Sequence, residues 1–162
     1  MRPVYIAALF LSLLVASEAR GEVPCDRECR CMAQALYFEA RGEGWRGQLA
    51  VASVILNRVR DRRFPGTPCR VVRHSKRRGL HRCQFSFWCD GKSERPGDNV
   101  AWSMAQGLAA TALASGLRVR GLERATHYHA ARVRPYWSRS LREVGRIGRH
   151  IFYEPVRSLG AN

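Results

Sequence analysis

The stretch Asp26–Glu43 reads DRECRCMAQALYFEARGE and predicts the first helix of the fold. Its apolar residues recur at intervals of three and four, which is the spacing of an amphipathic helix. Gly42 and Gly44 then predict that the helix stops at Ala40. Glu39 is therefore expected in the last helical turn, among apolar neighbours.

Further helices follow on the C-terminal side. Gly47–Arg60 has its apolar residues on one face, and Arg58 and Arg60 are expected to point to solvent. Cys69–His74 predicts a short helical turn, and Val100–Ser115 is an Ala-rich helix.

Three segments are prone to form strands, namely Gln84–Trp88, Ala125–Ala130 and Arg149–Tyr153. The basic stretch Ser75–Arg82 is typical of an exposed loop, and a polar, Arg-rich connection joins the last two strands. The order of these elements predicts an α+β fold, mainly helical, with a small β-lobe.

Composition narrows the class of protein. The 162 residues are 46% hydrophobic and 25% charged, which fits one compact domain from about Cys25 to Asn162. The net charge is +15, and Lys76 and Lys92 are the only lysines among 28 basic residues. Guanidinium groups suit bidentate contacts with carboxylate or phosphate, so the expected partner is anionic.

Residues 1–19 have the layout of a secretory signal, with Arg2, an apolar run from Val4 to Ala16, and small residues before cleavage after Ser17 or Ala19. The run is shorter than the ~20 residues that a bilayer requires. We therefore expect export, to the periplasm or the cell wall, without stable membrane insertion.

All six cysteines follow that segment, so disulfides are expected. Sequence leaves the pairing open, although Cys83 and Cys89 could close a short loop. Zinc bound by Cys25, Cys29, Cys31 and His81 is the rival interpretation, and the absence of a Cys-x-x-Cys pair disfavours it.

Two acidic residues, Glu39 and Glu43, lie at and just after the end of the first helix. An apolar environment raises the pKa of a carboxyl group, so Glu39 is a candidate proton donor, as glycosidic cleavage requires. The alternative is that Glu39 pairs with Arg41 or Arg58. Glu43 is expected to cap or brace the next helix.

Two further segments carry candidate binding residues. On a strand, Gln84 and Ser86 would share one face and could form a groove wall that binds sugar hydroxyls. The alternative is that Phe85 and Phe87 are core residues and the polar pair is merely solvated. Asp90, beside Gly91, has the composition of a turn residue.

The sequence His127-Tyr128-His129 places two imidazoles on one face of a strand and a phenol on the other. Such rings can stack on sugars. A metal is the other interpretation, but two histidines supply only half of a tetrahedral site, and Glu123 and Glu143 lack ligand spacing.

Several motifs occur in an order that closely resembles the cell wall hydrolase family of spore cortex-lytic enzymes. The resemblance spans most of the chain from Cys31 to Tyr153. The motifs are Ala35–Glu43, Gly47–Ala52, Val54–Val59, Cys83–Phe87 with Cys89–Gly91, Thr126–Ala130, Pro135 with Trp137, and Ile147–Gly148 with Ile151–Tyr153.

This resemblance implies a lysozyme-like fold that acts, without cofactor or metal, on the glycan strands of peptidoglycan. Glu39 matches the family's catalytic acid. Lytic transglycosylases of the family cleave between N-acetylmuramic acid and N-acetylglucosamine with one Glu and leave 1,6-anhydro ends. The expected substrate-binding residues are Gln84, Ser86, Phe87, Tyr128 and His129, and Asp90 and Glu43 are candidate secondary carboxylates. A monomer is expected.

Other functions remain as alternatives. A hydrolytic muramidase of the same family would need a second carboxylate at ~5–9.5 Å from the first. A non-catalytic, basic peptidoglycan-binding module would keep the fold without turnover. Nucleic-acid binding would follow from charge alone, but the export signal and the absence of any recognised nucleic-acid motif oppose it.

Overall fold

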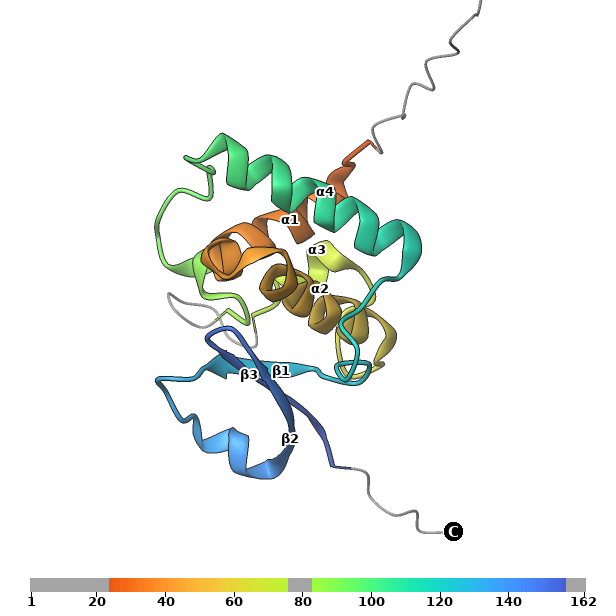
Figure 1. The fold of residues 1–162 in the computed structure, drawn as a ribbon, viewed down its shortest axis with the longest axis vertical. Coiled ribbons are helices and arrows are strands. Elements are labelled where there is room, and N and C mark those ends of the chain that lie inside the picture. The colour runs from red at the N-terminus through yellow and green to blue at the C-terminus, as the bar shows by residue number, and fades with distance from the viewer. Residues whose placement is uncertain (1–23, 76–82, 157–162) are drawn as a thin grey trace, which may run out of the picture.

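The structure is a computed structural model that describes residues 24–75 and 83–156. Within these ranges the helices gather in one lobe and the strands in another (Figure 1), which confirms the α+β prediction. With η for a 3-10 helix, the elements are α1 (Arg27–Ala40), η1 (Arg41–Glu43), α2 (Gly44–Arg60), α3 (Pro68–Val72), η2 (Ser86–Cys89), α4 (Asn99–Ser115), β1 (His127–Ala130), η3 (Tyr136–Ser140), β2 (Leu141–Ile147) and β3 (His150–Pro155).

Some predictions fall outside these ranges. The predicted signal segment 1–19, the proposed zinc ligand His81 and the loop residues 76–82 all lie outside the described residues. Among the described helices, none combines the length and apolarity needed to cross a membrane.

Helix α1 forms the centre of the helical lobe. Its N-cap is Asp26, whose carboxylate accepts the Cys29 N–H at 2.8 Å. Met32, Leu36 and Tyr37 are fully buried, and α1 contacts α2, α3 and α4. The predicted amphipathic helix is confirmed because its apolar stripe is what the other helices cover.

The six cysteines form three disulfides, Cys25–Cys29, Cys31–Cys69 and Cys83–Cys89. The second ties α1 to α3, and the third closes the short loop that the sequence suggested. The zinc interpretation is wrong for Cys25, Cys29 and Cys31, since a thiol in a disulfide is not a thiolate ligand.

The predicted strand Gln84–Trp88 is wrong, because the chain forms the 3-10 helix η2 there. An extended chain advances ~3.3 Å per residue, but the disulfide holds the Cα atoms of Cys83 and Cys89 6.0 Å apart. The expected alternation of buried and exposed side chains is nevertheless present, since Phe85 and Phe87 are buried and Ser86 is exposed.

The β-lobe is an antiparallel sheet with the order β1-β3-β2. Two strands agree with the predictions, and β2 lies in the segment that was expected to be an irregular Arg-rich connection. A bulge between Glu143 and Gly145 interrupts its pairing with β3. Such an extra residue breaks the period-two pattern by which a strand is found in sequence.

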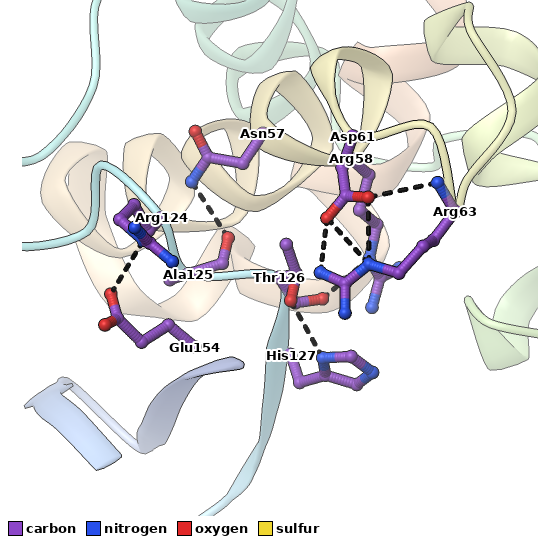
Figure 2. Close-up of polar contacts among 9 residues, drawn as sticks. All are labelled: Asn57, Arg58, Asp61, Arg63, Arg124, Ala125, Thr126, His127 and Glu154. Atoms are coloured by element: carbon purple, nitrogen blue, oxygen red, sulfur yellow. Dashed lines mark hydrogen bonds and ion pairs between the residues drawn. The ribbon is translucent and has the colours of Figure 1, made fainter. Parts of the chain in front are cut away.

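The last turn of α2 attaches the β-lobe to the helical lobe (Figure 2). The Asn57 side-chain amide donates to the carbonyls of Leu122 at 2.7 Å and Ala125 at 2.9 Å. Arg58 Nε donates to the Thr126 carbonyl at 2.8 Å. These bonds hold the segment that enters β1, so α2 determines where β1 begins.

Candidate active site

A cleft of about 1010 Å³ lies between the helical lobe and the β-lobe. It contains all eight residues that the sequence analysis selected as catalytic, substrate-binding or secondary carboxylates. These are Glu39, Glu43, Gln84, Ser86, Phe87, Asp90, Tyr128 and His129.

Glu39 reaches the cleft from the last turn of α1. Its Oε2 accepts a hydrogen bond from the Tyr128 hydroxyl at 3.2 Å. Burial raises the pKa of Glu39, and this outweighs the Tyr128 hydrogen bond and the charge of Arg58, which both lower it. A carboxyl group in this environment keeps its proton at higher pH than an exposed Glu and can donate it.

Arg58 is buried beside this carboxyl group, so the prediction that it points to solvent is wrong. Only 4% of the residue is exposed, and its Nη1 has no hydrogen-bond partner among the described residues. Burial lowers the pKa of Arg58 to about 10, and the negative charge that Glu39 carries when ionised opposes the shift. Arg58 is therefore still a cation near neutral pH.

The helical period could have revealed the burial of Arg58. It follows Val51, Val54 and Ile55 by seven, four and three residues, so it lies on their face of α2, and those three residues are fully buried. Its guanidinium lies over the rings of Phe64 and Phe85 at 5.3 Å and 5.6 Å.

Tyr128 comes from β1, and its ring packs near those of Phe85, His150 and Phe152 at 5.0 to 6.5 Å between centroids. Burial raises the pKa of Tyr128 well above its usual value, and the Glu39 charge adds to the shift. The hydroxyl therefore stays protonated and donates to Glu39. A direct bond to the candidate acid was not foreseen from the sequence, which indicated a sugar contact.

Glu43 is held by the turn between β2 and β3. Its Oε2 accepts the Arg149 backbone N–H at 3.1 Å, and its Oε1 lies 3.4 Å from Arg149 Nε and 3.2 Å from His150 Nδ1. A Cβ at Gly148 would lie 2.2 Å from Oε2. Glu43 occupies the N-cap position of α2 without a capping bond, so it braces the β-lobe and not the helix.

Asp90 ends η2 and accepts the Lys92 N–H at 2.9 Å, which is the geometry of a turn residue. Gln84 is half-buried and Ser86 is exposed. Phe87 is 8% exposed and stacks on Phe38 at 4.9 Å, so it belongs to the core although it borders the cleft.

His129 is buried and engaged on both ring nitrogens. Nε2 lies 2.9 Å from the Tyr153 hydroxyl and Nδ1 lies 2.9 Å from the Ala130 carbonyl. His127 Nδ1 lies 3.0 Å from the Thr126 hydroxyl (Figure 2), and its ring is 5.4 Å from that of Trp137. The imidazoles thus form part of an aromatic cluster beside the cleft.

The structure adds cleft residues that the sequence analysis did not assign to the site. They come mainly from the connection between β1 and β2 and from the turn before β3. They include Arg132, Tyr136, Trp137, Arg149 and His150, and Arg41, Lys92 and Glu94 also line the cleft. Trp137 was noted as part of a motif, but nothing in the spacing of the others indicated that they meet Glu39 across a cleft.

A helical lobe and a small sheet on either side of a cleft that holds a buried Glu define the lysozyme-like class of fold. Residues 42–153 match the model of the Cell Wall Hydrolase family. The chain belongs to that family. The matched range begins three residues after Glu39.

Similar proteins support the same family assignment. A spore cortex-lytic enzyme of Halalkalibacterium halodurans is 34% identical over 131 residues, which cover 78% of this chain and 34% of that protein. The spore cortex-lytic enzyme of Bacillus subtilis is 47% identical over 47 residues, covering 29% of this chain and 15% of that protein. The chain thus spans about a third or less of these curated relatives.

Among solved structures, the catalytic domain of germination-specific lytic transglycosylase SleB from Bacillus anthracis superposes with a TM-score of 0.60 at 29% identity. The match covers 78% of this chain and 93% of that domain. The catalytic domain of Bacillus cereus SleB gives a TM-score of 0.59, also at 29% identity, over 78% of this chain and 89% of that one. The predicted lysozyme-like fold and the resemblance to this family are therefore confirmed.

Proposed function

We propose that the protein cleaves the glycan strands of peptidoglycan as a lytic transglycosylase, with Glu39 as its catalytic acid and base. The observation that carries this proposal is the buried carboxyl group of Glu39, which lines the cleft and whose pKa is raised by burial. The similarity to SleB catalytic domains supports it, since one of these is named a lytic transglycosylase.

In the first step, protonated Glu39 gives its proton to the glycosidic oxygen between N-acetylmuramic acid and N-acetylglucosamine. The bond from that oxygen to C1 of the muramyl ring breaks, and C1 acquires oxocarbenium character. The Glu39 carboxylate that results is stabilised by the Tyr128 hydroxyl and the Arg58 charge. Both groups are in place before the charge develops, so little reorganisation is needed.

In the second step, the Glu39 carboxylate takes the proton of the C6 hydroxyl of the same muramyl ring, and O6 bonds to C1. This closes the 1,6-anhydro ring and returns Glu39 to its protonated form. No water is consumed, and no second carboxylate is required. Glu39 must therefore act first as an acid and then as a base. Burial favours its protonated form, and Tyr128 and Arg58 favour its charged form.

The other acids of the cleft fit hydrolysis less well. The Glu43 carboxylate is 3% exposed and contacts Arg149 and His150, so it is poorly placed to activate water. Asp90 is bound in its own turn. Glu94, which is half-buried, also lines the cleft. Asp90 and Glu94 are therefore the acids to test for the alternative, a muramidase with two carboxylates.

The test uses purified sacculi in isotopically labelled water and mass spectrometry of the released fragments. Transglycosylation gives anhydro ends without label, whereas hydrolysis gives reducing ends that carry labelled oxygen. Glu39→Gln should lower the rate of release at least ~10²-fold while binding to sacculi persists. Glu123→Gln, an exposed change outside the cleft, is the matched control. Labelled ends, or full activity of Glu39→Gln, contradict the proposal.

The proposal includes action outside the cytoplasm, in the periplasm or at the cell wall. Three disulfides support this location, because such bonds persist in oxidising compartments. The net charge of +15 supports binding to an anionic polymer such as peptide-bearing peptidoglycan.

A further inference from the structure

A second hollow, of about 340 Å³, lies on the β-lobe beside the cleft. His129 borders both hollows. The segment that connects β1 to β2 separates them, with Arg132 and Tyr136 facing the cleft and Val133 and Arg134 facing the second hollow. A branched ligand could therefore lie in the cleft and send its branch into the second hollow.

Two arginines of the second hollow have no ion-pair partner among the residues that the structure describes. Arg134 and Arg139 are both exposed, and neither forms an ion pair within the described parts of the chain. The acid of the same hollow, Glu143, accepts a hydrogen bond from Tyr153 at 3.5 Å. The hollow therefore offers unpaired guanidinium groups to an anion.

The sugars of a peptide-bearing strand do not explain this charge. N-acetylglucosamine is neutral, and the lactyl carboxyl group of N-acetylmuramic acid is taken up in the amide bond to the peptide stem. The carboxylates of such a strand are therefore on the peptide stems that branch from its muramyl residues. Val133, Leu141 and Ile151 give the same hollow an apolar part, which suits the small side chains and backbone of a peptide.

We propose that the second hollow binds the peptide stem of a muramyl residue held in the cleft, with Arg134 and Arg139 pairing with the stem's carboxylates. This inference rests on the proposed function and names its substrate class, which is peptide-bearing strands in preference to bare ones. The substrate would then straddle the connection between β1 and β2 at His129.

The test compares two substrates, uncross-linked glycan strands with their peptides and the same strands after removal of the peptides, which leaves only the lactyl carboxylate beside each muramyl ring. Two exposed ion pairs predict roughly a fivefold to tenfold higher kcat/KM for the peptide-bearing strands. Arg134→Gln with Arg139→Gln should abolish this preference by raising KM, with kcat and the rate on bare strands unchanged. Arg46→Gln with Arg70→Gln removes the same charge from exposed sites outside both hollows and should keep the preference.

Salt gives a second measurement that needs no variant, because the preference of the wild type should shrink as ionic strength rises. Equal kcat/KM for both substrates in the wild type overturns the inference, and so does a preference that survives in the Arg134 and Arg139 variant. Cleavage of neither substrate would instead contradict the proposed function. The two failures are thus distinguishable.

Discussion

The Tyr128 hydroxyl donates to Glu39 Oε2 at 3.2 Å and links β1 to the last turn of α1. This bond crosses the cleft between the lobes at the proposed catalytic acid. It favours the charged form of Glu39, against the burial that favours the neutral form. The protonation of Glu39 thus depends on a residue 89 positions away in the sequence.

Tyr128→Phe removes the hydroxyl and keeps the ring that packs near Phe85 and Phe152. Because the lost bond lowered the pKa of Glu39, that pKa should rise, and the alkaline limb of the pH profile of kcat should move to higher pH. The maximal kcat should fall about tenfold, the cost of one hydrogen bond to a charge. An unchanged limb would show that this bond does not act on Glu39 in solution.

Arg58 can be tested by separating its charge from its hydrogen bond. Arg58→Gln removes the charge that lowers the pKa of Glu39, so the alkaline limb should again move to higher pH. Arg58→Lys keeps the charge, so its limb should stay near that of the wild type. Both variants lose the bond from Nε to the Thr126 carbonyl and should lose about 1–3 kcal/mol of stability. Equal pH profiles for the two variants would contradict an electrostatic role.

Glu39→Gln should be more stable than the wild type at neutral pH. A raised pKa means that the folded state binds more protons than the unfolded state between the ordinary value of 4.5 and the raised value. The free energy of unfolding of the wild type therefore falls as pH rises through that window, and the variant lacks this loss. Denaturant titrations should show a difference that vanishes below the window. The lowered pKa of His150 acts in both proteins and cancels.

Gly148→Ala should destabilise the turn between β2 and β3. The added Cβ would lie 2.2 Å from Glu43 Oε2, at a residue whose φ of +56° already disfavours a side chain. We expect a loss of at least about 1–3 kcal/mol in the free energy of unfolding. The matched control is Gly107→Ala within α4, where nothing lies within 4 Å and helix propensity predicts a gain of about 0.5–1 kcal/mol. Partial recovery in Gly148→Ala combined with Glu43→Ala would assign the loss to the clash.

Short stretches of sequence predicted the elements whose structure depends mainly on residues close to one another along the chain. Helix α1 could be read from its stripe of apolar residues, and Glu39 could be placed in its last turn because Gly42 and Gly44 follow. An acid among apolar residues already suggested a raised pKa, which the structure bears out. These inferences needed only neighbours along the chain.

Predictions were wrong or missing where a distant residue or a long-range constraint dominates. The alternation at Gln84–Trp88 predicted a strand, but a disulfide forces a turn there. Arg58 was assigned to solvent by its charge, whereas the Thr126 carbonyl and the rings of Phe64 and Phe85 accommodate it inside. The hydrogen-bond partner of Glu39 depends on where β1 lies relative to α1. A short stretch of sequence does not contain this information.

Helix α2 also sets the distance between the two points at which the β-lobe is attached. Glu43 holds the β-lobe at the start of this helix, and Asn57 and Arg58 hold it in the last turn. At 1.5 Å per residue the two attachments are separated by roughly 20 Å of rigid helix. Two attachments so far apart resist rotation of the β-lobe about either one alone, so we expect the cleft to keep its width along α2 when a glycan strand binds.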